Sequence, residues 1–219
     1  MGFYYSLNDS LERANYCLKE AQRTAKVQKD TATLCLAMTR YSWVVRKTHP
    51  EAGLEYAKRV LGLYEKYSKR NVFNIVYNTL MVCECENFCG NPRRAFSLAQ
   101  QAEKNALALG DSTVISDVYQ DMAYFAVSLG DKRSTHFALL SCRYSDTRFV
   151  SKRLMLAKAY EKTGNYHECI NLLDTLRLEN NGQRYEAFAM RHRAAVKLND
   201  PAALSYADSA YHYIEAMFD

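Results

Sequence analysis

The residues best suited to chemistry, cysteine and histidine, are scattered along this sequence and form no catalytic motif. Of the seven cysteines, only Cys83, Cys85 and Cys89 lie close together. On a helix, Cys83 and Cys85 point about 200° apart and cannot share a tetrahedral metal ion, while Cys85 and Cys89 have no third ligand nearby. The chain also contains no Gly-rich phosphate loop, no GxSxG turn and no HExxH motif. We therefore expect a protein that is not an enzyme and that holds no metal or other cofactor.

A second group of side chains suits recognition better than catalysis. Arg40, Trp43 and Arg46 lie within two turns of one expected helix, and Tyr77 lies in another. A flat aromatic ring beside guanidinium donors is typical of a hot spot that binds a peptide with an acidic group. The alternative is that Trp43 packs between helices while the arginines are solvated or paired with Glu84. The residue types leave both interpretations open.

The charge of the chain permits an acidic partner without requiring a nucleic acid. The formal net charge is +5 and the isoelectric point is near 8.7. One basic run, Arg148, Lys152 and Arg153 followed by Lys158 and Lys162, lacks stacking aromatic residues at useful spacing. It is more typical of a solvated helix face, and we expect no direct contact with nucleic acid.

The composition favours an all-helical protein. The 219 residues are 48% hydrophobic and include only 8 Gly and 3 Pro, too few turn residues for an all-β fold. No apolar stretch is long enough for a membrane span, and the N-terminus does not resemble a signal peptide. The odd number of cysteines, mostly beside apolar residues, indicates buried thiols in a reducing compartment, so we expect a cytoplasmic protein.

The elements that must position these residues are marked by regularly spaced turns. The triplet Leu-Gly-Asp occurs twice, with Gly110 and Gly130 where a left-handed residue would end a helix and an Asp would cap the next one. Similar helix ends lie at Asp9, His49, Gly90, Gly130, Gly164 and Asn199, spaced by 40, 41, 40, 34 and 35 residues. A near-constant period with a helix on each side indicates a helix-turn-helix solenoid.

The expected organisation is a single domain over residues 1–219. An extra N-terminal helix, 10–28, precedes helix pairs at about 31–68, 72–109, 113–144, 148–178 and 184–217. All three prolines, Pro50, Pro92 and Pro201, are expected in the first turn of the second helix of a pair, where a missing N–H costs nothing.

One segment resembles the tetratricopeptide repeats. In Leu154 to Leu176, LMLAKAYEKTGNYHECINLLDTL, the matching residues are Ala157, Tyr160, Gly164, Asn165, Tyr166 and Cys169. The resemblance implies an all-α, right-handed superhelical solenoid of antiparallel helix pairs, whose first helices line a concave surface. The period near 40 residues is also similar to the sensor arms of bacterial regulators.

The resemblance further implies which residues line that surface. Positions two, five, nine and twelve of the first helices, together with one flanking arginine, give the candidate ligand-binding residues Arg40, Trp43, Arg46, Tyr77, Glu84, Gln120, Tyr124, Lys158 and Arg193. Family members that hold the carboxylate of chaperone tails have Asn at position nine. Here position nine is Trp43, Glu84, Tyr124, Lys158 or Arg193, so we expect no such carboxylate clamp.

Three functions are compatible with these features. The first is a non-catalytic scaffold that binds a protein or peptide on the concave face, where the basic residues would suit an acidic partner. The alternative is the ligand-sensing arm of a transcriptional or signalling regulator whose effector domain lies outside this sequence. The third is a dimerisation strut, because the last helix carries two apolar stripes that suit homodimer formation through an end of the solenoid.

Overall fold

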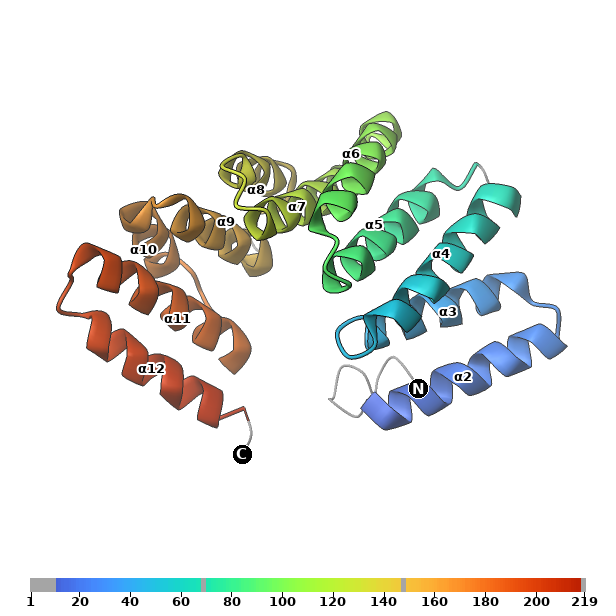
Figure 1. Ribbon diagram of the computed structural model, residues 1–219, viewed down its shortest axis with the longest axis horizontal. Helices are drawn as coiled ribbons and strands as arrows, with labels where there is room; N and C mark the ends of the chain where they lie inside the picture. The colour runs from blue at the N-terminus through green and yellow to red at the C-terminus, as the bar shows by residue number, and fades with distance from the viewer. Residues whose placement is uncertain (1–10, 68–69, 147–148, 218–219) are drawn as a thin grey trace. The chain divides into compact units, whose positions relative to one another are not determined.

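The computed structural model describes residues 11–67, 70–146 and 149–217 and is built of helices connected by short turns. Within these ranges the chain forms eleven helices and no strand (Figure 1). The helices are α2 (Leu11–Val27), α3 (Thr31–Val45), α4 (Pro50–Tyr67), α5 (Val72–Phe88), α6 (Pro92–Leu109), α7 (Ser112–Ser128), α8 (Ser134–Tyr144), α9 (Val150–Thr163), α10 (Tyr166–Asp174), α11 (Asn181–Leu198) and α12 (Ala203–Glu215).

The turns between these helices have the conformations that the sequence predicts. Gly110 and Gly130 adopt positive φ angles of 74° and 67°, a region that residues with a Cβ disfavour. Asp111 then accepts hydrogen bonds from the backbone N–H groups of Thr113 and Val114, at 2.8 and 3.2 Å. The two Leu-Gly-Asp triplets therefore end one helix and lead into the next, as expected.

Two helix ends differ from the expected ones by three residues or more, and one proline lies outside the helix in which it was expected. Helix α10 ends at Asp174 instead of near residue 178, and α11 begins at Asn181 instead of 184. The earlier start has a clear cause, because the side chain of Asn180 accepts a hydrogen bond from the backbone N–H of Gln183. Pro201 precedes α12 and lies in the turn, so the expectation that it falls within the first turn of that helix is wrong.

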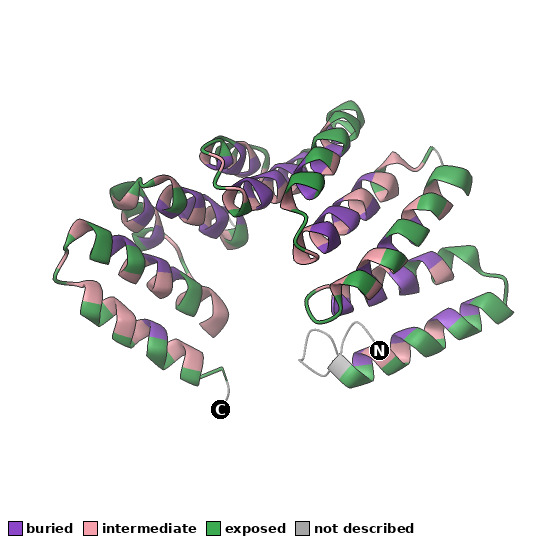
Figure 2. Ribbon diagram, in the orientation of Figure 1, coloured by how far each residue is buried: buried purple, intermediate pink, exposed green. Residues whose placement is uncertain are grey.

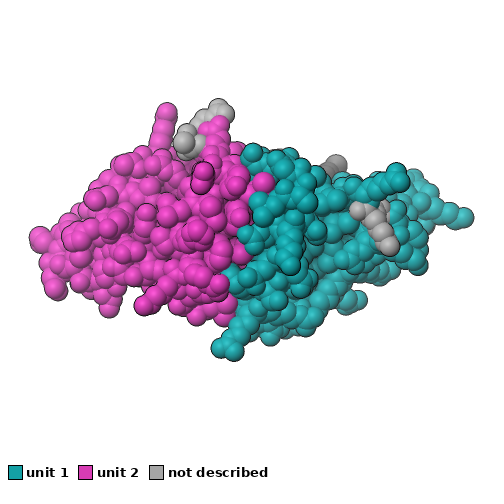
Figure 3. Space-filling model, turned by 90° about the horizontal axis from the view of Figure 1, so that it is seen from above, with its two compact units in different colours: residues 1–114 teal, residues 115–219 magenta. Residues whose placement is uncertain are grey.

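The chain divides into two compact units, residues 1–114 and 115–219 (Figure 3), and α7 contains the point of division. In unit 1 each helix from α3 to α6 packs against the helix before it, and α3 also contacts α5. Its core, among the described residues, includes buried clusters that contain Val45, Met38 and Val82. Figure 2 shows buried stretches on α2, α3 and α5.

Two small residues let α3 and α4 approach closely in unit 1. The hydroxyl of Ser42 donates a 2.7 Å hydrogen bond to the backbone carbonyl of Gly53. A Cβ added to Gly53 would lie 3.2 Å from the Cα of Arg46 and 3.3 Å from the Sγ of Cys85. Only glycine fits this crossing without displacing a neighbour.

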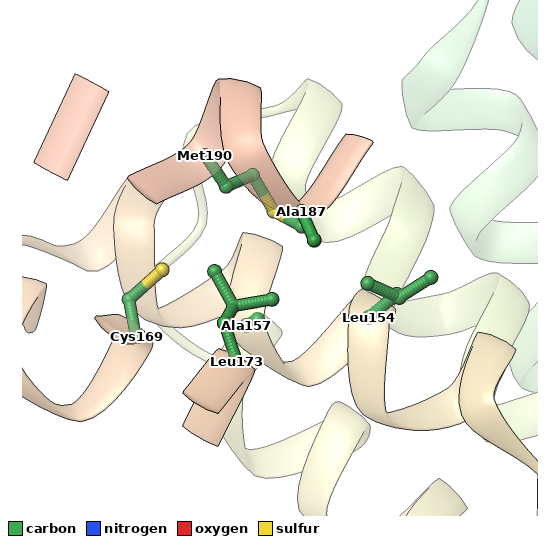
Figure 4. Close-up of a cluster of buried hydrophobic side chains, with 6 residues drawn as sticks. All are labelled: Leu154, Ala157, Cys169, Leu173, Ala187 and Met190. Carbon is green, nitrogen blue, oxygen red and sulfur yellow. The ribbon is translucent and has the colours of Figure 1, made fainter. Parts of the chain in front are cut away.

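Unit 2 repeats the pattern with its own core. Helix α9 packs against α8, α10 and α11, and α11 packs against α12. The buried cluster at its centre combines side chains of α9, α10 and α11 (Figure 4): Leu154, Ala157, Cys169, Leu173, Ala187 and Met190. The hydroxyls of Ser116 and Ser141, both buried, each donate a 2.8 Å hydrogen bond to the other residue's backbone carbonyl and so join α7 to α8.

Candidate functional site

In unit 1 the candidate residues lie on two first helices, α3 and α5, that run side by side. The hydroxyl of Thr39 donates a 2.9 Å hydrogen bond to Oδ1 of Asn78. Two turns further along both helices, Nε of Arg46 lies 2.6 Å from Oε2 of Glu84. Because the later residue of α3 meets the later residue of α5, the two helices are parallel, and their exposed sides form one continuous face.

Arg46 is held by three groups of the chain itself. Its guanidinium stacks 4.4 Å above the ring of Trp43, donates to the carbonyl oxygen of Trp43, and pairs with Glu84. The side chain of Arg46 is only 14% exposed. Burial raises the pKa of Glu84, although the charges of Arg46 and Lys47 partly oppose this effect. The structure thus has the arginine paired with Glu84, the arrangement that the sequence left open as the alternative.

Trp43 contributes to packing as well as to the exposed side of α3. It is half-buried and packs against the cluster of Ala14, Leu18, Tyr41, Val44 and Val45. Arg40 and Tyr77 are also half-buried. The ring of Tyr77 lies 4.7 Å from that of Phe73, at an interplanar angle of 55°.

In unit 2 the candidate residues lie on α7, α9 and α11. Nζ of Lys158 lies 5.3 Å from the centre of the Tyr124 ring, in a cation–π contact between α9 and α7. Gln120 is half-buried one turn before Tyr124 on the same side of α7. Together they place an amide, an aromatic ring and an ammonium group next to one another.

The remaining charged groups of this side of unit 2 are matched within the chain. Arg193 makes two hydrogen bonds to the carboxylate of Glu161, at 2.8 and 2.9 Å, and the buried Lys152 pairs with Asp117. Burial alone would raise the pKa of Glu161, but the hydrogen bond and charge of Arg193, with the charge of Lys162, hold it below its usual value. In the described part of unit 2, no carboxylate lies within ion-pair distance of Lys158.

The nine candidate residues therefore fall into two sets, within which direct contacts join Arg46 to Trp43 and Glu84, and Lys158 to Tyr124. Unit 1 holds Arg40, Trp43, Arg46, Tyr77 and Glu84, and unit 2 holds Gln120, Tyr124, Lys158 and Arg193. We call the sides of the first helices that carry these sets the first-helix face of each unit. Sequence reasoning did not identify Glu161 as the partner of Arg193, nor the pair of Asp117 with Lys152. For Glu161 a signal existed, because residues of opposite charge occupy position twelve of one first helix and position nine of the next.

Two further features bear on what the described residues can bind. A pocket of about 380 Å³ lies beside the starts of α9 and α11 and is lined by Asp146, Phe149, Val150, Ser151, Glu179 and Gln183. It contains none of the nine candidate residues. Among the described residues, no group of three or more His, Cys, Asp or Glu is arranged to hold a metal ion, and no described helix is long and apolar enough to cross a membrane.

The fold is similar to solved structures at low sequence identity. BtubC (BKLC) from P. vanneervenii superposes with a TM-score of 0.72 over 95% of this chain and 92% of its own, at 12% identity. A Rap protein complexed with competence and sporulation factor gives a TM-score of 0.71 over 99% of this chain and 72% of its own, at 17% identity.

A third structure identifies the repeat type. It is a signal transduction ATPase with numerous domains from Pyrococcus horikoshii that has a tetratricopeptide repeat sensor. It gives a TM-score of 0.65 at 16% identity, and the match covers 98% of this chain but 36% of that one. No family model and no curated protein matches the sequence. The chain has an all-α fold of the tetratricopeptide-repeat type.

Proposed function

We propose that this chain of tetratricopeptide-repeat type is a non-catalytic binding protein that holds an acidic peptide, or an acidic segment of a larger protein, on its first-helix face. The observation that carries the proposal is that no described carboxylate pairs with the ammonium group of Lys158. Its neighbours Lys152 and Arg193 are matched by carboxylates, whereas Lys158 has no ion pair with a carboxylate of the described residues and lies 5.3 Å from the centre of the Tyr124 ring. A half-buried ammonium group without a carboxylate gains a partner when an anionic ligand arrives.

The groups around Lys158 suit an extended peptide. The primary amide of Gln120 has both a donor and an acceptor, the combination that pairs with a backbone amide of a ligand. Tyr124 supplies a flat ring that stays in place because it already contacts Lys158. In α9, Lys152 precedes Lys158 and pairs with Asp117, and Glu161 follows Lys158 and pairs with Arg193. These charges are therefore already neutralised within the chain and compete less for a ligand.

The first test replaces Lys158 by methionine, which keeps the apolar stem and removes the charge. Binding of fluorescein-labelled peptides of graded acidity is measured by fluorescence polarisation. We expect Lys158→Met to weaken the acidic peptides about tenfold, the value of one lost charge-assisted hydrogen bond. Neutral peptides should bind equally to both proteins.

The matched control is Lys104→Met, which removes an exposed lysine from α6, a second helix. It should leave every affinity unchanged. Equal weakening by both variants would mean that net charge, and not the site at Lys158, attracts the peptides. An unchanged affinity in Lys158→Met would remove the observation on which the proposal rests.

A second candidate function is the sensing arm of a regulator. Its support is the likeness to the Pyrococcus horikoshii protein, in which a match to this chain covers only about a third of the whole molecule. The two functions differ in what a bound peptide does. A sensing arm should change its radius of gyration in small-angle scattering when the acidic peptide binds, whereas a scaffold should keep the same radius.

A further inference from the structure

Helix α12 has one side that is open to solvent. The helix packs against α11, and its buried Ala210 lies on the opposite side. Leu204, Asp208, Tyr211 and Glu215 follow one another at intervals of four, three and four residues, which places all four on the open side. Leu204 is 73% exposed, Tyr211 is 63% exposed, and both carboxylates are exposed as well. We call these four residues the α12 stripe.

Helix α2 has a similar open side that carries basic residues. It packs against α3 through a cluster that contains the buried Leu18. On the other side of the helix, Tyr16, Lys19, Arg23 and Val27 follow one another at intervals of three, four and four residues. Tyr16 is 69% exposed, Val27 is 79% exposed, and both basic residues are exposed. We call these four residues the α2 stripe.

The two helices that carry the stripes have opposite net charges. Helix α2 contains four basic and two acidic residues, a net charge of +2. Helix α12 contains two carboxylates and neither lysine nor arginine, a net charge of −2. Within the described part of the chain, neither Arg23 nor Asp208 forms an ion pair. The opposite charges of the two stripes are therefore available to each other.

The spacing of the residues also matches when the two helices are antiparallel. Each stripe extends over twelve residues, 16–27 and 204–215, or about 17 Å of helix. An antiparallel alignment places Val27 opposite Leu204 and Arg23 opposite Asp208, so that apolar meets apolar and base meets acid. A parallel alignment would place Val27 against the carboxylate of Glu215. The antiparallel alignment is therefore the complementary one.

We propose that the α12 stripe of one copy of this chain binds the α2 stripe of a second copy. The partner is a second copy because both complementary surfaces belong to the same chain. The contact is heterologous, so a complex of two copies keeps one unoccupied stripe of each kind and can add further copies. One helix against one helix gives a small interface, and the association should depend on protein concentration. The proposal does not depend on the binding of a peptide.

The weight-average mass of the full chain, measured by sedimentation equilibrium over a hundredfold range of concentration, tests the contact. We expect the mass of the wild type to rise above 25.2 kDa as the concentration increases. Arg23→Asp and Asp208→Arg each place like charges opposite one another. Each variant alone should therefore raise the dissociation constant more than tenfold.

A mixture of the two variants tests whether the contact joins two different stripes. Arg23→Asp keeps its α12 stripe and Asp208→Arg keeps its α2 stripe, and these unaltered stripes fit each other. We expect the equimolar mixture to recover the association that each variant lacks alone. A loss of association in only one of the two variants would indicate a symmetric contact of a single stripe, and would overturn the proposal.

The matched control is Arg93→Asp, which makes the same change of charge at an exposed residue of α6. It should associate like the wild type, and an equal loss in this variant would show that net charge alone governs the association. All variants should keep the melting temperature of the wild type, because the replaced residues are exposed. A wild-type mass of 25.2 kDa at every concentration would also overturn the proposal.

Discussion

Single small side chains decide how closely the helices of unit 1 approach. Gly53 sits where α4 crosses α3, with its carbonyl held by Ser42 and its Cα facing Arg46 and Cys85. Gly62 lies in the same helix but faces open space, with nothing within 4 Å of an added Cβ. One helix therefore contains two glycines whose replacement by alanine should have opposite effects.

We expect Gly53→Ala to lower the free energy of unfolding by about 1–2 kcal/mol, because the backbone of α3 and the sulfur of Cys85 would have to move. Gly62→Ala should raise it by about 0.5–1 kcal/mol, since alanine loses less backbone entropy in an exposed helix. Urea denaturation followed by circular dichroism measures both. Stabilisation by both variants would show that the crossing of α3 and α4 has room to spare.

Ion pairs between consecutive first helices are a recurring feature of the elements. Arg46 of α3 pairs with Glu84 of α5, and Glu161 of α9 pairs with Arg193 of α11. Both pairs join position twelve of one helix to position nine of the next, with the charges reversed. They hold neighbouring helices in register and also leave fewer free charges for a ligand than the sequence alone suggests.

The pair in unit 2 should give a measurable pH dependence. The folded-state pKa of Glu161 lies below its usual value of 4.5, so the pair stabilises the fold above that pH and its contribution is lost as the pH falls through the folded-state pKa. We expect Arg193→Ala to cost about 1–2 kcal/mol at pH 7 and less as the pH is lowered through the folded-state pKa of Glu161, because protonation of Glu161 removes the ion pair. An equal loss of unfolding free energy in Arg193→Ala at neutral and acidic pH would contradict this pairing.

The helices were easier to predict from the sequence than the contacts of their side chains. Local signals such as Gly110 and Gly130 place helix ends because turn conformation depends on a few adjacent residues. The partner of Arg193 lies 32 residues away in the sequence, and its identity depends on the register between two helices. The exposure of Phe73 likewise follows from what the neighbouring helices leave uncovered, which no periodicity in α5 reveals.

At the scale of the whole molecule, the chain consists of two compact units, each with its own buried core. Each core contains a fully buried thiol: Cys85 beside Ser42 in unit 1, and Cys169 in the cluster of Figure 4 in unit 2. Burial raises the pKa of Cys85 to about 11 and that of Cys169 to about 12. Near neutral pH, neither thiol is both accessible and ionised while its unit is folded.

The alkylation rates of these two thiols therefore report separately on the opening of unit 1 and of unit 2. Alkylation by iodoacetamide needs an exposed thiolate, so the labelling rate of each cysteine should report how often its own unit opens. We expect the half-exposed Cys17 to be labelled first, and Gly53→Ala to accelerate labelling of Cys85, as measured by mass spectrometry of the digested protein. The alkylation rate of Cys169 in Gly53→Ala is compared with its rate in the wild type. An unchanged rate would mean that unit 2 opens independently of unit 1, and an increased rate would mean that the two units open together.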